Sequence, residues 1–269
     1  MMRSMLRTRV ITALVGIPAI LMCAWLGKLP FLFFVLIIVL AGLYEFHTLV
    51  VKGGCKTPVV LLFLGGLIFP IAFYGYPELL GVFVFGYLLS CYGYFLYKHA
   101  TFTPVDLALT ILAVIYVAWG FSHILLLRLL EQGFWLVLYV FLIVWSTDSG
   151  AYFAGISLGK HKLAPGISPN KTWEGFVGGL VASMAAALLL TSLVSLELSR
   201  TLVLIAPIVS VSGQFGDLFE SSIKRFARTK DSGNLIPGHG GVLDRFDSML
   251  WATPLTYYLI LMISRYTTL

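Results

Sequence analysis

The chain has 269 residues, of which 59% are hydrophobic and 11% are charged, and its mean hydropathy is +0.95. Soluble domains average about 25% charged residues, so this composition excludes a soluble domain and predicts an integral membrane protein. The net charge of +6 would suit nucleic acid, but the basic residues lie at the ends of apolar stretches and in two loops. That placement favours anionic headgroups or phosphates as partners, and no nucleic acid is expected.

Apolar stretches long enough to cross a bilayer as helices, about 20 residues each, recur along the sequence. They predict an all-α, polytopic membrane protein with about nine transmembrane helices and a polar site facing the cytoplasm. The expected spans are 10–27, 30–49, 58–75, 79–97, 106–127, 133–154, 175–195, 201–219 and 249–265. We expect residues 1–132 to be largely structural and residues 133–269 to carry the catalytic loops.

Positive charges are distributed unevenly between the two sides of these spans. With the amino terminus in the cytoplasm, fourteen Lys and Arg residues lie inside, Arg3, Arg7 and Arg9 among them, and four lie outside. The positive-inside rule therefore supports this orientation and an odd number of spans. The first span is interpreted as uncleaved because no small-residue cleavage site follows it. The short basic amino terminus fits a bacterial inner membrane.

Two acidic residues lie at the cytoplasmic ends of expected spans. Glu45 ends the second span, and the sequence assigns it no role. Asp148 ends the sixth span beside Ser149 and Tyr152, which extend a polar surface. An ionised Asp at the centre of a bilayer costs about 2.5–3.5 kcal/mol on insertion scales, so it is normally kept where a cavity or a partner relieves it. We favour a binding role for Asp148 over a simple interfacial position.

The loop after the sixth span contains residues 168–175, SPNKTWEG. Gly166 and Pro169 predict a turn, and Thr172 can cap the helix that follows. Lys171, hydroxyl groups and free backbone amides at the start of a helix are typical of a phosphate site. An ordinary basic loop with a helix cap is the alternative, and this stretch alone does not decide between the two.

Residues 221–247, SSIKRFARTKDSGNLIPGHGGVLDRFD, are a polar stretch in an apolar chain. Its glycines and prolines predict a loop in the middle, whose backbone can approach a ligand closely. On the preceding helix, Asp217, either Glu220 or Ser221, and Lys224 share one face because residues three and four apart are neighbours. If the last helix begins at Asp244, that residue caps it and Asp247 suits its first turn. Capping does not explain the glycines and basic residues around these two acids.

The acidic residues of the second half have no cluster of Cys or His beside them. Carboxylates alone suit hard cations such as Mg²⁺. Two such ions about 3.5–4 Å apart can stabilise the attacking and leaving oxygens of a phosphoryl-type displacement. The nearby Lys and Arg side chains can neutralise a triphosphate and a departing pyrophosphate.

Three stretches, 148–152, 168–175 and 221–247, resemble in order the motifs of the phosphatidate cytidylyltransferases, the CDP-diacylglycerol synthases. The resemblance implies that CTP and phosphatidate give CDP-diacylglycerol and pyrophosphate, that Mg²⁺ is required, and that the protein forms a homodimer in the lipid bilayer. One alternative is a CTP-dependent lipid kinase, which would transfer the terminal phosphate. A less favoured one is an ion-coupled transporter that uses intramembrane acids.

Given this resemblance, residues in the three motifs, and Asp217 on the helix before the third motif, receive three kinds of expected role. The catalytic group is Asp217, Lys224, Arg225, His239, Asp244 and Arg245. The substrate-binding group is Asp148, Ser168, Asn170, Lys171, Thr172, Glu174, Lys230 and Asp231. The expected metal ligands are Asp217, Asp244 and Asp247, with two metal sites.

Overall fold

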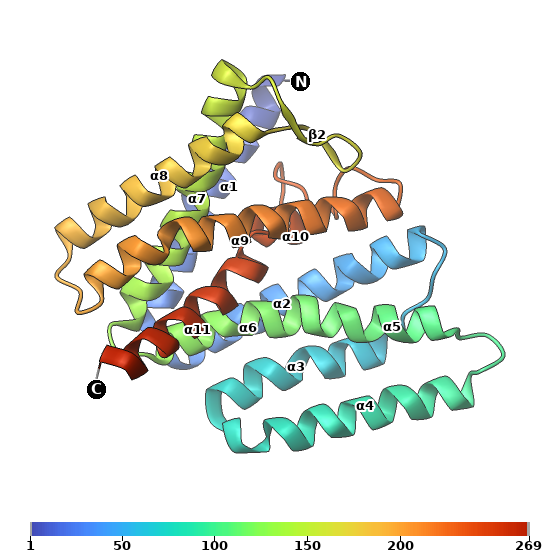
Figure 1. The fold of residues 1–269 in the computed structure, drawn as a ribbon. Helices are drawn as coiled ribbons and strands as arrows, with labels where there is room; N and C mark the ends of the chain where they lie inside the picture. The colour runs from blue at the N-terminus through green and yellow to red at the C-terminus, as the bar shows by residue number, and fades with distance from the viewer. Residues whose placement is uncertain (1, 268–269) are drawn as a thin grey trace. The chain divides into compact units, whose positions relative to one another are not determined.

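A computed structural model of the chain is dominated by long helices (Figure 1). The structure describes residues 2–267, and within them the side chains of residues 10–264. The side chains of Arg3, Arg7 and Arg9 lie outside this described part, so the charge argument for their side of the membrane stays a prediction.

The helices follow one another with short connections. The first half contains α1 (Met2–Leu26), α2 (Lys28–Lys52), α3 (Val59–Gly75), the 3₁₀ turn η1 (Pro77–Leu79), α4 (Leu80–Tyr97), α5 (Pro104–Ala113), the π-helical segment η2 (Val114–Trp119) and α6 (Gly120–Leu129). The second half contains α7 (Gly133–Leu158), the strands β1 (Lys162–Ala164) and β2 (Ser168–Thr172), α8 (Trp173–Leu193), α9 (Ser199–Phe226), α10 (Leu243–Phe246) and α11 (Met249–Thr267).

Helices lie at all the positions where the sequence predicts membrane spans, which confirms the all-α, polytopic class. Within the described residues, seven helices are long and apolar enough to cross a bilayer. Two further apolar helical segments are shorter: Val10–Leu26, which is the part of α1 with described side chains, and Val59–Gly75, which is α3. The protein is therefore a multi-pass membrane protein, but the predicted count of nine spans is not confirmed.

The chain divides into two compact units. Unit 1 contains the residues up to Leu126 together with Ile223–Phe246. Unit 2 contains Leu127–Ser222 and the residues from Asp247 onward. The expected division at residue 132 into a largely structural and a catalytic half stays a prediction, and the sequence did not predict that Ile223–Phe246 belongs to the same unit as the amino-terminal helices.

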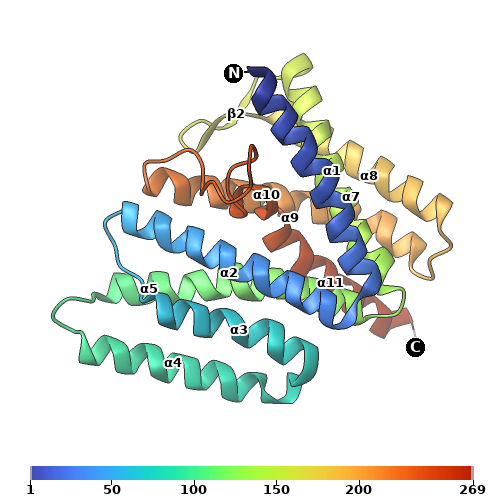
Figure 2. The ribbon, with the colours of Figure 1, turned by 180° about the vertical axis from the view of Figure 1, so that it is seen from behind.

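Within unit 1, helices α2, α3, α4 and α5 run side by side (Figure 2). A capping box fixes the start of α5. The Thr103 hydroxyl accepts a hydrogen bond from the backbone N–H of Asp106, and the Asp106 carboxylate accepts one from the backbone N–H of Thr103. Such reciprocal bonds satisfy amide groups that a helix end leaves unpaired. Asp106 is buried and also accepts the backbone N–H of Lys56 at 2.6 Å.

In unit 2, a short antiparallel hairpin of β1 and β2 leads into α8. The turn expected at Gly166 is confirmed, but Pro169, which was expected in the same turn, lies in β2, and the pairing of the two arms as strands was not predicted. Thr172 caps α8, as expected, by accepting the backbone N–H of Gly175 at 3.1 Å. This cap places β2 directly at the amino-terminal end of α8.

Helices α7 and α8 pack with their backbones close together at Gly150. A Cβ atom at this position would lie 2.5 Å from the Ala182 Cβ and 2.6 Å from the Gly178 carbonyl oxygen. Because such contacts force one helix away from the other, we expect Gly150→Ala to destabilise the protein by about 1–3 kcal/mol. Thermal unfolding in detergent measures the effect. Gly86→Ala on α4 is the matched control, because a Cβ there meets nothing within 4 Å. An unfolding temperature that is unchanged in both variants would contradict the expectation.

Candidate active site

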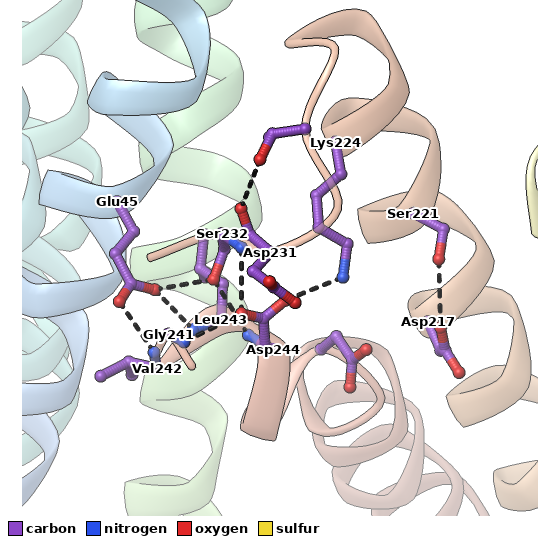
Figure 3. A network of polar contacts seen from close by, with 12 residues as sticks. Glu45, Asp217, Ser221, Lys224, Asp231, Ser232, Gly241, Val242, Leu243 and Asp244 are labelled. Atoms are coloured by element: carbon purple, nitrogen blue, oxygen red, sulfur yellow. Dashed lines mark hydrogen bonds and ion pairs between the residues drawn. The ribbon is translucent and has the colours of Figure 1, made fainter. Parts of the chain in front are cut away.

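The polar loop of unit 1, residues 227–242, separates α9 from α10 as the sequence predicts. The Asp244 carboxylate connects the two arms of this loop, one containing Ser232 and the other containing Gly241. Its Oδ1 accepts the Lys224 ammonium at 2.8 Å, and its Oδ2 accepts the backbone N–H groups of Ser232 at 2.9 Å and Gly241 at 2.8 Å (Figure 3). The side chains of Lys224 and Asp244 are 12% and 6% exposed. This partly buried ion pair fixes a cation and a carboxylate at the two ends of the loop.

Asp244 does not cap the last helix. The short helix α10 already begins at Leu243, and α11 begins at Met249. The capping interpretation is therefore wrong, because the Asp244 carboxylate turns back to the loop amide groups of Ser232 and Gly241.

A cavity of about 690 Å³ opens on this loop within unit 1. Its lining brings together three of the predicted residues, Asp231, His239 and Arg245, with backbone from Gly238 and Gly240. Gly240 has a φ of +87°, a conformation that glycine adopts without strain. A guanidinium and exposed backbone near an imidazole are groups that bind phosphate oxygens.

Unit 2 contains a second polar cavity of about 560 Å³. Its polar lining comes from α7, β2 and α9: Asp148, Asn170, Lys171, Thr172 and Asp217. The Lys171 ammonium lies 2.7 Å from the Asp217 carboxylate, and both side chains are partly exposed, at 24% and 31%. The structure thus gathers five of the predicted residues of unit 2 around one cavity.

The Asp247 carboxylate, just before the start of α11, experiences the charge of three other carboxylates of unit 2. Asp148, Asp217 and Glu220 lie close enough to Asp247 to interact with it electrostatically. Ser221, one turn after Asp217 on α9, donates to the Asp217 carboxylate at 3.3 Å, as their helical spacing predicts. Within the described part of the chain, no three His, Cys, Asp or Glu side chains form a ready metal-binding group.

The remaining predicted residues lie outside the linings of these two cavities. The Glu174 carboxylate accepts the His161 ring nitrogen at 2.6 Å, which ties α8 to the hairpin. Ser168 pairs with Ala164 in that hairpin. Arg225 is exposed and donates to the Thr229 carbonyl oxygen at 3.2 Å. Lys230 is also exposed. Their assigned roles stay predictions.

Comparison with known proteins identifies the family of this chain. A model of the cytidylyltransferase family matches residues 7–263. The chain belongs to the cytidylyltransferase family. It is therefore an enzyme of the nucleotidyltransferase class, and the family resemblance stated from its motifs is confirmed.

Relatives of this cytidylyltransferase cover nearly its whole length. The phosphatidate cytidylyltransferase of Bacillus subtilis is 38% identical over 268 residues, which is 96% of this chain and 99% of the relative. The protein of the same name from Staphylococcus aureus is 35% identical over 262 residues, 95% of this chain and 99% of the relative. One from Staphylococcus epidermidis is 47% identical over 161 residues, 60% of this chain and 61% of the relative.

Two polar residues of this cytidylyltransferase line the cavities although neither was predicted to belong to the site. Gln214 faces the cavity of unit 2, and its side-chain amide donates to the Phe176 carbonyl oxygen at 3.3 Å. Asn234 lines the cavity of unit 1. The position of Gln214 three residues before Asp217 was a usable signal, because such neighbours share a helix face. No comparable pattern marks Asn234 within its irregular loop.

Proposed function

We propose that this cytidylyltransferase transfers the cytidylyl group of CTP to phosphatidate and releases pyrophosphate. The observation that carries the proposal is the relationship, over nearly the whole chain, to proteins named phosphatidate cytidylyltransferase. The cavities support it, because Lys171 in unit 2 and Arg245 in unit 1 are cations suited to phosphate groups.

In the proposed reaction, a phosphate oxygen of phosphatidate attacks the α-phosphorus of CTP. A new phosphorus–oxygen bond forms as the bond to the oxygen bridging the α- and β-phosphates breaks, and that oxygen leaves with its electron pair on pyrophosphate. The nucleophile is ionised near neutral pH, so no strong general base is needed. Positioning and charge neutralisation therefore supply the rate enhancement.

The cations of the motifs have distinct proposed tasks. Lys171, Lys224, Arg225 and Lys230 bind phosphate oxygens. His239 and Arg245 shape the loop or contact the transferring group. Because Lys224 is held by Asp244, its ammonium has a fixed position before substrate binds, which lowers the cost of orienting it in the transition state.

We propose Mg²⁺ as the cofactor, held by Asp217 and Asp247. The donor chemistry fits, because these carboxylates and their neighbours Asp148 and Glu220 offer only oxygen, and a cation would relieve the repulsion that the other three exert on Asp247. When bound, Mg²⁺ neutralises charge on the phosphates. Asp244 stays a predicted ligand, but its oxygens already accept Lys224 and two loop amides. A second ion, as the motifs imply, belongs to the same proposal.

We also propose that the enzyme is a homodimer in a bacterial inner membrane, with its amino terminus and polar loops on the cytoplasmic side. Cys55, in the loop between α2 and α3, tests the orientation. A membrane-impermeant maleimide applied to intact cells is expected to leave Cys55 unlabelled until the cells are permeabilised. In a Cys55→Ser background, the Glu197→Cys variant should be labelled without permeabilisation. The reverse pattern would overturn the orientation.

Pyrophosphate release by the purified full-length protein tests the activity. We expect release that requires CTP, phosphatidate and Mg²⁺ together. Diacylglycerol in place of phosphatidate is the matched control, because it lacks the attacking phosphate, and it should give no pyrophosphate. Release with diacylglycerol, or none with phosphatidate by folded protein, would contradict the proposal.

A further inference from the structure

Glu45, near the carboxyl-terminal end of α2, is a buried carboxylate that contacts the polar loop of unit 1. Its side chain is 2% exposed. Its Oε1 accepts the backbone N–H of Val242, and its Oε2 accepts that of Leu243, both at 2.9 Å. Oε2 also accepts the Ser232 hydroxyl at 3.0 Å (Figure 3). One side chain from the first half of the sequence thus binds both arms of the loop.

Ser232 connects Glu45 with Asp244. The Ser232 hydroxyl donates to Glu45 and accepts the backbone N–H of Asp244 at 3.3 Å. The Ser232 backbone N–H donates to the Asp244 carboxylate at 2.9 Å. A continuous chain of hydrogen bonds therefore runs from Glu45 through Ser232 to Asp244 and on to Lys224.

The same carboxylate explains two glycines of the loop. A Cβ at Gly233 would lie 2.6 Å from Glu45 Oε1, and one at Gly241 would lie 2.5 Å from Glu45 Oε2 and clash with the Ser232 hydroxyl. Any other side chain at either position would push the carboxylate out of its place. The loop is therefore built around Glu45, in addition to the contacts that Asp244 makes.

We propose that Glu45 is a positioning residue for nucleotidyl transfer, which acts through Ser232 and the backbone of Val242 and Leu243 to hold Asp244 and Lys224 in place. The inference rests on the proposed function, because cytidylyl transfer is the reaction whose rate Glu45 would affect. A buried carboxylate is retained where its hydrogen bonds are complete, and its removal leaves the loop amides without their acceptor. Supporting residues of this kind typically change activity by about 10- to 100-fold when they are substituted.

The test compares Glu45→Gln with Asp106→Asn in the full-length protein. Asp106 is the matched control, because it is a buried carboxylate of the same unit whose hydrogen bonds go to Lys56 and Thr103 and not to the polar loop. We expect Glu45→Gln to lower kcat about 10- to 100-fold per folded molecule, with the KM for CTP changed less than about threefold. Asp106→Asn should lower only the unfolding temperature.

Two further measurements keep the inference testable if Glu45→Gln folds poorly. Ser232→Ala removes one link and should lower kcat by itself. In the double variant Glu45→Gln with Ser232→Ala, the two losses of kcat should be less than additive, because both residues act through one network of hydrogen bonds. Hydrogen exchange followed by mass spectrometry should show faster exchange of residues 232–244 in the Glu45 variant and unchanged exchange there in the Asp106 variant.

The outcomes separate the inference from the proposed function. Unchanged kcat in folded Glu45→Gln or Ser232→Ala protein, an equal loss in Asp106→Asn, or an effect confined to KM would overturn the positioning role. If wild-type protein fails to form CDP-diacylglycerol, the proposed function fails. The exchange measurement then still decides whether Glu45 holds the loop.

Discussion

Replacement of Asp244 by Asn is expected to abolish turnover, with a fall in kcat/KM of at least about 10²- to 10³-fold, the range seen when one preorganised charged or polar group of a transition-state site is removed. The amide carries no charge for Lys224, and only its single oxygen can accept the hydrogen bonds that the two carboxylate oxygens accept now. Loss of one partner from a buried ion pair also costs about 3–5 kcal/mol, so folding must be measured beside activity.

The control for this experiment is the partner residue. Lys224→Met alone leaves the Asp244 carboxylate without its cation and should also destabilise the protein, whereas the double variant with Asp244→Asn should be no less folded than Asp244→Asn alone, because removing both charges leaves neither one without its partner. All three variants should be inactive. Near-normal turnover by folded Asp244→Asn protein would remove Asp244 from the catalytic group.

Asp217→Asn and Asp247→Asn are expected to weaken the response to Mg²⁺. Loss of residues that merely support a metal ligand typically costs about 10- to 100-fold in affinity or activity, so loss of a ligand should raise the half-saturating Mg²⁺ concentration at least as much. Kinetics at varied Mg²⁺ measure this. Binding of Mn²⁺ to the protein without CTP, followed by electron paramagnetic resonance, gives a readout that does not depend on turnover.

Glu197→Gln is the matched control for these variants, because Glu197 is an exposed acid of unit 2 in the connection between α8 and α9. It should leave both the Mg²⁺ response and Mn²⁺ binding unchanged. An unaltered Mg²⁺ response in folded Asp217→Asn and Asp247→Asn proteins would show that these carboxylates do not hold the ion.

Local patterns in the sequence predicted those features that depend on neighbours in the chain. Long apolar runs predicted the helices, because a bilayer-spanning helix satisfies its own backbone hydrogen bonds. A Thr before an apolar run predicted the cap at Thr172, and Gly and Pro predicted the loop after α9. The short hairpin was missed because β1 has three residues and β2 has five, which is too short for a period of two to be recognised.

Contacts between distant residues could not be predicted in the same way. Glu45 stood out as an acid at the end of an apolar helix, but its partner Val242 lies 197 residues away. Lys171 and Asp217 were each assigned to the site, yet nothing in their spacing placed them 2.7 Å apart. The sequence therefore identified candidate residues one at a time, and the packing of the helices decides which of them touch.

The fate of each phosphate of CTP tests the central claim most directly. Purified protein with phosphatidate and Mg²⁺ would receive CTP labelled at the α-phosphate in one reaction and at the γ-phosphate in another. We expect the α-label to enter the lipid phase and the γ-label to stay in water as pyrophosphate, in equal amounts. Transfer of the γ-label to lipid, with the α-label left in water as CDP, would contradict cytidylyl transfer and establish a CTP-dependent lipid kinase.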